Sequence, residues 1–327
     1  MRYVLEGSVQ RDQNRVRVNA QLIDGETGAH LWADRFEEDV ADLFKLQDQI
    51  VARLAISLHY ALTSAEAEKG ARSNNPDVVD LTMQGWNLLR PPSDDRESVK
   101  KARGLFEQAL QIDPNDANAL AGSAQTYVID SIYGWGEAGT DYQAKVLGQA
   151  NRAIALFAGN VRAYLAKSLY LSLPAHQFDE ALGVADAGLA VNANYVSLYV
   201  PRAVAENALG RYEQAKADME RAMRLSPHDT FVPIWREIIG DAEMGLGRFD
   251  AAIVQYRKAI DSGFRASRAY AALAAAYARA GKMHEAETAL GEARRLNPAI
   301  TVKWMKEHTP NLPAVFDGLR KAGLPEE

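Results

Sequence analysis

Residues 196–229 read VSLYVPRAVAENALGRYEQAKADMERAMRLSPHD, and residues 267–300 read SRAYAALAAAYARAGKMHEAETALGEARRLNPAI. The two stretches are equally long, and small, aromatic and proline residues stand at the same offsets in both. A period of about 34 residues is typical of stacked helical hairpins, because one hairpin alone cannot bury its apolar face. The sequence therefore predicts a mainly α-helical solenoid. The matching pairs include Tyr199 with Tyr270, Ala203 with Ala274, Gly210 with Gly281, Ala215 with Ala286, Ala222 with Ala293, and Pro227 with Pro298.

The same pattern recurs, with slips in the loops, so that about six copies lie between Leu89 and Pro298. The distance in sequence between equivalent small residues near the ends of successive copies measures the period. The second copy is about ten residues longer than this period. Because a solenoid tolerates insertions only where its hairpins meet solvent, we expect an extra loop or longer helices there. The small residues that mark the copies are Ala109, Ala153, Gly188, Ala222, Ala259 and Ala293.

The repeated residues serve packing. Ala203 and Ala215 let two helix backbones approach, and Gly210 and Pro227 stand where the two helices of a hairpin end. In this pattern, over roughly residues 76 to 300, the chain resembles the tetratricopeptide repeat. The resemblance implies an α-solenoid of about six hairpins with a C-terminal cap, which binds a peptide or a partner domain and is not an enzyme.

The first seventy residues follow a different pattern. Alternating apolar and polar residues predict strands over Tyr3–Arg11, Arg15–Asp24 and Ala29–Asp39, with turns between them. Leucine and isoleucine at helical spacing predict an amphipathic helix over Val40–Thr63. Three strands and one helix make a poor independent domain, since the helix covers only part of one sheet face.

This segment resembles the second half of the TolB-like α/β domain, through residues 3–9, 21–24, 31–33 and 43–48. Residues 318–325 resemble the end of the adenylate-cyclase-linked group of such proteins. The resemblance implies part of a bacterial regulator, a class III adenylate cyclase or a CadC-like winged-helix protein, whose effector domain lies upstream. The expected organisation is a partial TolB-like α/β segment at 1–70, a repeat array at 71–300 and C-terminal capping helices at 301–327.

An unpaired strand edge and an uncovered apolar face favour pairing with a second copy of the chain. We therefore expect a homodimer, or a larger oligomer, through residues 1–40. The alternative is that the first repeats fold back and cover this edge.

Composition excludes several classes of function. The net charge is −6, and basic residues alternate with acidic ones, so no basic stripe is expected to follow a nucleic-acid backbone. The chain has no cysteine, none of its six histidines lies three or four positions from another, and no apolar run is long enough for a bilayer. We expect a soluble, cytoplasmic protein without cofactor or metal.

Residues Gly134–Gly139 match the G-x-G-x-x-G pattern, but a helix is expected before them, where the dinucleotide-binding motif requires a strand. Aromatic residues crowd this insertion, among them Tyr133, Trp135 and Tyr142. They suit either a contact with a partner, through Trp135, or the filling of a gap between widened hairpins.

First helices of tetratricopeptide repeats line the ligand-binding face, and the register of the copies predicts its exposed positions. The family's clamp for a C-terminal carboxylate is not reproduced, because Val200, Glu237 and Ala271 stand where Lys or Asn is required. The candidate partner-binding residues are Gln84, Asn87, Asn118, Gln125, Asn207, Glu237, Asp241, Arg268 and Arg279, with Trp135 from the insertion.

Two functions follow from this pattern. The first is a regulatory protein-interaction module of a signalling protein, with a peptide or a partner domain as its ligand. The alternative is an architectural segment, in which residues 1–40 self-associate and the solenoid spaces the effector domains.

Overall fold

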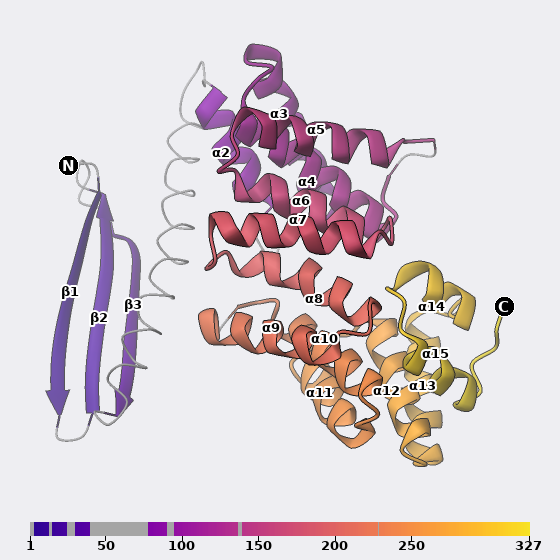
Figure 1. Ribbon diagram of the computed structural model, residues 1–327. Helices are drawn as coiled ribbons and strands as arrows, with labels where there is room; N and C mark the ends of the chain where they lie inside the picture. Colours follow the sequence, from indigo (N-terminus) through magenta and orange to yellow (C-terminus); the bar gives the residue numbers. More distant parts are fainter. Residues whose placement is uncertain are drawn as a thin grey trace. The chain divides into compact units, whose positions relative to one another are not determined.

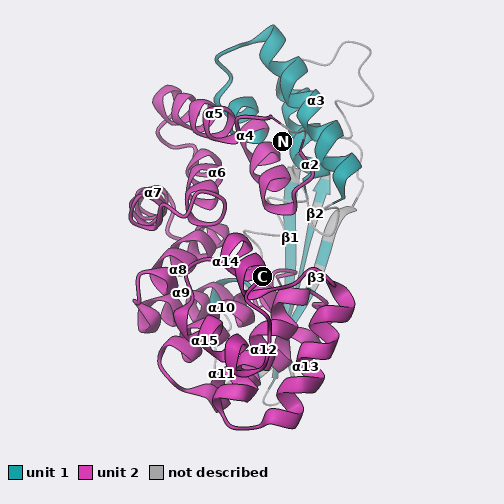
Figure 2. Cartoon of the chain, turned by 90° about the vertical axis from the view of Figure 1, so that its right-hand side faces the viewer, with its two compact units in different colours: residues 1–122, 224–226 teal, residues 123–223, 227–327 magenta. Residues whose placement is uncertain are grey.

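The computed structural model describes residues 3–12, 15–24, 30–39, 78–89, 95–136, 139–227 and 229–327. The chain divides into two compact units, residues 1–122 with 224–226 and residues 123–223 with 227–327 (Figure 2). The helix expected over Val40–Thr63 lies outside the described residues.

Three antiparallel strands form the N-terminal sheet, in the order β1-β2-β3. The predicted strands are confirmed almost to the residue. The alternation is most regular in β2, as a two-sided sheet requires. In the register, Val9 of β1 pairs with Val18 of β2, which in turn pairs with Phe36 of β3. The strands are β1 (Tyr3–Asp12), β2 (Arg15–Asp24) and β3 (His30–Asp39).

The two faces of the sheet differ in chemistry. One face carries Val16, Ala20 and Phe36, which are buried. On the same face of β1, Leu5 is 50% exposed and Val9 is 71% exposed. The other face carries charged and amide side chains. In the described part of the chain β1 pairs with β2 alone, so its outer edge has no strand beside it.

Unit 1 also contains the first hairpin, α2 (Val78–Leu88) and α3 (Arg96–Ile112). Phe106 of α3 is fully buried and lies against Gly85 of α2, where a Cβ atom would come within 2.7 Å of the ring. Gly85 is therefore the small residue of this hairpin. The sequence register placed Leu89 and Trp86 in the signature and is corrected here, since Trp86 is half-buried, edge-on to Phe106.

Five further hairpins follow, and the helices of unit 2 run as successive neighbours along the chain (Figure 1). With α2 and α3 they make the six predicted pairs within the described residues, and the solenoid fold is confirmed. The pairs are α4 (Ala117–Tyr133) with α5 (Tyr142–Leu156), α6 (Val161–Ser172) with α7 (Phe178–Val191), α8 (Tyr199–Ala208) with α9 (Tyr212–Leu225), α10 (Val232–Gly245) with α11 (Phe249–Asp261), and α12 (Ser267–Arg279) with α13 (Met283–Leu296).

Small residues set the distance between the helices of a pair. Gly240 of α10 faces the ring of Tyr256 of α11, and a Cβ atom there would lie 2.5 Å from a ring carbon. The four alanines that repeat in α9 and α13 are all fully buried, as the period predicts, because each lets a neighbouring helix approach. They are Ala215, Ala222, Ala286 and Ala293.

Glycine ends the first helix of the last three pairs. Gly210, Gly247 and Gly281 have φ values of 75°, 72° and 78°, a left-handed conformation that glycine adopts without steric cost. The extra residues of the second copy are divided between α4, which is longer than the first helices α8, α10 and α12, and the connection from α4 to α5. The predicted excess is therefore both a longer helix and a longer connection.

Two short helices close the chain. They are α14 (Val302–His308) and α15 (Pro313–Lys321). The main neighbours of α15 are α12 and α10, the first helices of the last two pairs. No helix in the described residues is long and apolar enough to cross a membrane.

Candidate partner-binding surface

The first helices of unit 2 pack side by side. α6 contacts α8, α8 contacts α10, and α10 contacts α12, while α7 and α11 each pack on the first helix of their own pair and on the one that follows. The part of α4 after Gly122 packs on α6 through Ala124 and Val128. We call the surface formed by this part of α4 with α6, α8, α10 and α12 the first-helix layer. Its side chains come from separate hairpins that the repeat holds at a fixed spacing, which suits recognition of an extended or helical ligand.

A buried ion pair joins two helices of this layer. Arg268 of α12 donates from Nη2 to Oε2 of Glu237 of α10 at 2.9 Å. Burial raises the pKa of Glu237, and Arg268 opposes that rise. Glu237 was predicted to be exposed, but it is 5% exposed, because the stripe that carries it faces the neighbouring first helix. Its carboxylate therefore positions Arg268, which is half-buried.

Asp241 lies one turn after Glu237 on α10. The hydroxyl of Tyr256, from α11, donates to Oδ1 of Asp241 at 2.7 Å. Burial, and then the neighbouring Glu237, raise the pKa of Asp241 to about 8. Burial also raises the pKa of Tyr256, so this hydroxyl keeps its proton and remains a donor. The structure thus brings together three of the predicted residues, Glu237, Asp241 and Arg268, in one polar cluster.

Asn207 was also predicted to be exposed, and this is corrected. It is 2% exposed, and its Nδ2 donates to the backbone oxygen of Ile238 at 3.0 Å. The physical reason is the close approach of α8 and α10, which turns this position into a bridge between hairpins. Asn207, through Nδ2, and Glu237 therefore hold the layer together, while Oδ1 of Asn207 is buried and accepts no hydrogen bond within the described residues.

Arg279 and Gln125 are half-buried. The Arg279 guanidinium lies 4.7 Å from the ring centroid of Phe249, so it stacks on the second helix of the preceding pair. Gln125 of α4 has a buried Oε1 that accepts no hydrogen bond within the described residues. An amide oxygen left in this state suits a donor from a ligand.

The remaining predicted helix positions lie in unit 1. Gln84 and Asn87 are half-buried on α2, and Asn118 is exposed in the first turn of α4.

Trp135 lies in the insertion and stacks on Tyr133, with ring centroids 4.6 Å apart and 16° between the ring planes. Next to it is a depression of about 560 Å³, lined by Asp130, Tyr142 and Tyr170 together with the glycines of the insertion. Burial, and then Asp141, raise the pKa of Tyr170. The stacked pair supplies an aromatic contact surface, and Tyr133 is half exposed.

A second polar cluster was missed from the sequence. Arg202 of α8 pairs with Asp186 of α7 at 2.7 Å and with Asp218 of α9 at 2.9 Å, and Oε1 of Glu206 lies 4.0 Å from it. Burial and then Asp218 raise the pKa of Glu206 to about 8, and burial raises that of Asp218 to about 6. Arg202 and Glu206 stand at signature positions of the repeat, which was the only signal in the sequence.

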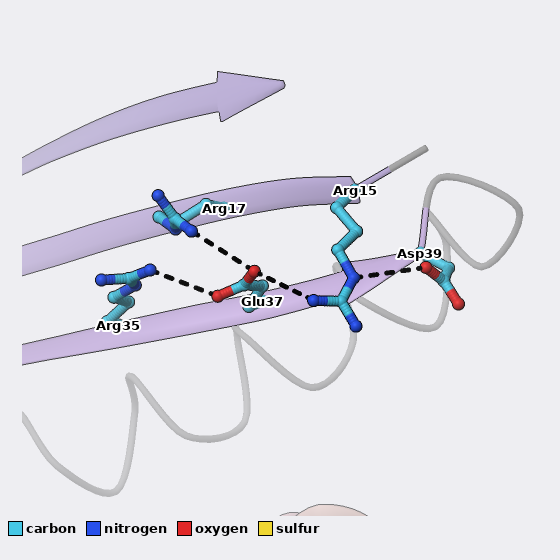
Figure 3. A network of polar contacts seen from close by, with 5 residues as sticks. All are labelled: Arg15, Arg17, Arg35, Glu37 and Asp39. Atoms are coloured by element: carbon cyan, nitrogen blue, oxygen red, sulfur yellow. Dashed lines mark hydrogen bonds and ion pairs between the residues drawn. The ribbon is translucent and has the colours of Figure 1, made fainter. Parts of the chain in front are cut away.

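The polar face of the N-terminal sheet carries a charge network (Figure 3). Glu37 accepts from Arg15, Arg17 and Arg35 at 3.3 to 3.5 Å, and Arg15 also pairs with Asp39 at 3.9 Å. Hydrogen bonding from Arg17 lowers the pKa of Glu37 most. These are exposed pairs with little net energy, so the network chiefly keeps this face hydrated.

Comparison with known families supports the repeat assignment. The tetratricopeptide repeat model matches residues 197–229 and 237–262. The chain therefore contains tetratricopeptide repeats, and this fold is typical of protein-interaction modules.

Two curated proteins are similar over part of their length. One, named "Putative adenylate cyclase 3", from Rhizobium meliloti (strain 1021), is 36% identical over 156 residues, which are 47% of this chain and 26% of that protein. The other is kinesin light chain-related protein 3 of Arabidopsis thaliana, 28% identical over 222 residues, which are 61% of this chain and 32% of that protein. The chain spans about a quarter to a third of these relatives.

Solved structures share the fold at low sequence identity. The crystal structure of the APC/C hetero-tetramer Cut9–Hcn1 superposes with a TM-score of 0.62 at 16% identity, over 86% of this chain and 49% of that one. The human IFIT1 dimer with PPP-AAAA gives 0.55 at 17% identity, over 87% and 69%. The type IV pilus biogenesis factor PilW gives 0.53 at 15% identity, over 71% and 96%.

Proposed function

We propose that the repeat array is a non-catalytic interaction module of a bacterial signalling protein, and that it binds a peptide or a partner domain on the first-helix layer. The observation that carries the proposal is the layer itself. Successive first helices lie side by side, and polar groups from separate hairpins meet on them. Such a surface recognises extended or helical ligands by contacts spaced along their length.

The accessible residues of the surface are not those that hold it together. Nδ2 of Asn207 and the carboxylate of Glu237 have partners inside the layer, whereas Oε1 of Gln125, like Oδ1 of Asn207, is buried and accepts no hydrogen bond within the described residues. Trp135 and Tyr133 add a stacked aromatic pair at the C-terminal end of the helix that carries Gln125. We propose Gln125 and Trp135 as ligand contacts, and Arg268 and Arg279 as positively charged positions whose orientation is fixed by Glu237 and Phe249.

The role in signalling rests on the similarity to the protein from Rhizobium meliloti that is named "Putative adenylate cyclase 3". Repeats in a longer regulator of this kind place a sensor next to an effector. No group of histidine, aspartate and glutamate side chains suited to a metal ion occurs among the described residues. We propose a cytoplasmic location and that the repeats themselves do not carry out catalysis.

Site-specific photo-crosslinking tests this function. A crosslinking residue at Gln125 or Trp135 of the full chain, in its native host, is compared with one at Val254, an exposed position on the second helix α11. We expect one protein to be captured from both Gln125 and Trp135 and not from Val254. Capture at Gln125 must then fall when Trp135 is changed to alanine. Equal capture at all three positions would contradict the proposal.

The second candidate function is architectural and involves the sheet. The outer edge of β1 has no strand beside it in the described residues, and Leu5 and Val9 are exposed there. Edges of this kind pair with other chains. We propose a homodimer through residues 1–40. Light scattering should give twice the chain mass at tens of micromolar, and Val9→Lys should give a monomer, whereas a monomeric wild type would exclude it.

A further inference from the structure

One stripe of residues on α12 lies on the same side of the helix as the contact with α10. Arg268, Ala271, Ala275 and Arg279 recur at spacings of three and four residues, which places them on one side of the helix. Arg268 reaches Glu237 on α10 from this stripe, so the stripe turns toward the layer. In an open layer its alanines would meet solvent or a ligand. Ala271 and Ala275 are nevertheless fully buried.

The chain's own last helix covers this stripe. The main neighbours of α15 are α12 and α10, and α15 lies beside α12 in Figure 1. Gly318 of α15 sits against Ala275, where a Cβ atom would come within 2.7 Å of the Ala275 Cβ and carbonyl oxygen. Because two of the atoms it would meet are backbone atoms of α12, only glycine fits this crossing. Val315, Phe316 and Leu319 are buried along the same side of α15.

The sixth hairpin is complete without α15, since α12 already packs on α13 and α11. α15 resembles a bound peptide in several respects. It is a short amphipathic helix of nine residues that begins at Pro313, and Asp317 and Arg320 face solvent. Beyond it, the oxygens of Pro325 and Glu326 accept from the backbone nitrogens of Val302 and Lys303 at 2.9 and 3.0 Å, which ties the tail to α14.

We propose that the groove between α10 and α12 is a receptor for a short amphipathic helix, that α15 is its resident ligand in cis, and that a partner helix of the same chemistry displaces it. The partner helix carries large apolar residues at the places of Val315, Phe316 and Leu319, and a glycine at the crossing with Ala275. This rests on the proposed function of the first-helix layer and deepens it, by naming the ligand and the segment that regulates access.

Occupation in cis sets the expected size of the effect. A ligand from outside binds only the fraction of molecules whose groove is open, so its apparent affinity falls by that fraction. A change that expels α15 without altering α12 must therefore tighten the binding of an added helix. Gly318→Ala does this, because the new methyl group meets the backbone of α12.

The matched control is Gly291→Ala. Gly291 is exposed on α13, and nothing lies within 4 Å of the position of its Cβ. The probe is a fluorescent peptide of residues 311–327, and its binding to the full chain is followed by anisotropy. We expect Gly318→Ala to bind this peptide at least about tenfold more tightly than the wild type, and Gly291→Ala to match the wild type.

A second peptide, itself carrying Gly318→Ala, should bind neither chain, because its methyl group meets the same backbone. Equal affinity of the wild-type and Gly318→Ala chains for the first peptide would overturn the proposal. So would equal binding of the two peptides.

Arg320→Ala keeps the proposal testable if Gly318→Ala does not fold. Arg320 is exposed, pairs with Asp317 at 2.8 Å and contacts Glu326, so its loss removes the side-chain contact between α15 and the tail without a clash in the core, while the backbone bonds from Val302 and Lys303 remain. We expect a smaller rise in peptide affinity, about two- to threefold, together with faster amide exchange in α15. An Arg320→Ala chain whose affinity and exchange match the wild type would overturn the proposal.

The two proposals can fail separately. If crosslinking at Gln125 captures a partner but the peptide fails to bind the opened chain, only the receptor for α15 is wrong. If the peptide binds the opened chain and crosslinking at Gln125 and Trp135 gives nothing, the groove of α10 and α12 stands and the wider first-helix surface does not.

Discussion

Gly240→Ala tests the packing of the repeats where it is tightest. The added Cβ atom would lie 2.5, 2.7 and 2.9 Å from three ring atoms of Tyr256, well inside ordinary contact. Tyr256 is fully buried, and its hydroxyl is held by Asp241 at 2.7 Å, so the ring has no room to retreat. Overpacking of a core costs about 1–3 kcal/mol, and alanine returns about 0.5–1 kcal/mol of helix propensity. We expect a net loss of about 1–2 kcal/mol.

The control is Gly183→Ala on α7, where the glycine is exposed and nothing lies within 4 Å of the Cβ position. It should gain about 0.5–1 kcal/mol from helix propensity alone. Repeat arrays open locally, so native-state hydrogen exchange is the suitable assay, read on the amides of α10 and α11 for the first variant and of α7 for the second. If Gly240→Ala leaves exchange in α10 and α11 unchanged, or slows it as Gly183→Ala does in α7, the assigned packing of Gly240 on Tyr256 is wrong.

Three further predictions follow from the buried polar groups and the first hairpin. Burial raises the pKa of Glu206 to about 8 from an ordinary value of 4.5, so folding favours its protonated form. The free energy of unfolding should therefore fall as the pH rises from about 4.5 to 8. Glu206→Gln should flatten this dependence, as measured by urea titrations at each pH. Tyr256→Phe removes the hydroxyl that donates to Asp241. The free energy of unfolding should therefore fall by about 1–3 kcal/mol at pH 9, where Asp241 is ionised, and by clearly less at pH 6. An equal loss of stability at both pH values would contradict this hydrogen bond. Phe106→Ala should lower the free energy of unfolding by about 3–5 kcal/mol, and Trp86→Ala should lower it by less, since Phe106 is fully buried and Trp86 is half-buried. If calorimetry finds Trp86→Ala the more destabilising change, the register that places Trp86 in the signature is correct.

The period of the sequence was sufficient to predict the hairpins. Small residues such as Ala215 and Ala293 repeat because the two helices of every pair need the same close approach. The pattern is therefore local and can be recognised in the amino-acid sequence. The strands were equally predictable, since alternation in Arg15–Asp24 reflects the two faces of a sheet. The register failed in the first hairpin, where Gly85 lies against Phe106, because more residues separate α2 from α3 than separate the two helices of each of the last three pairs.

Exposure within the first-helix layer was less predictable. Asn207 and Glu237 stand at positions that line a ligand face in the family pattern, yet here both are buried by the next first helix. Polar residues alone do not reveal whether their partner is a ligand or a neighbouring hairpin. The packing of α15 on α12 was not predictable either. The contact of Gly318 with Ala275 joins a repeat helix to a segment outside the repeats, and the repeat period says nothing about where that segment packs.

The most direct test of the binding surface is amide hydrogen exchange on the full Gly318→Ala chain, with and without the peptide of residues 311–327. We expect the peptide to slow exchange in α10 and α12, which carry the groove, and to leave α11 and α13 as they were. Protection that is absent, or that falls on α11 and α13, would contradict binding at the first-helix layer.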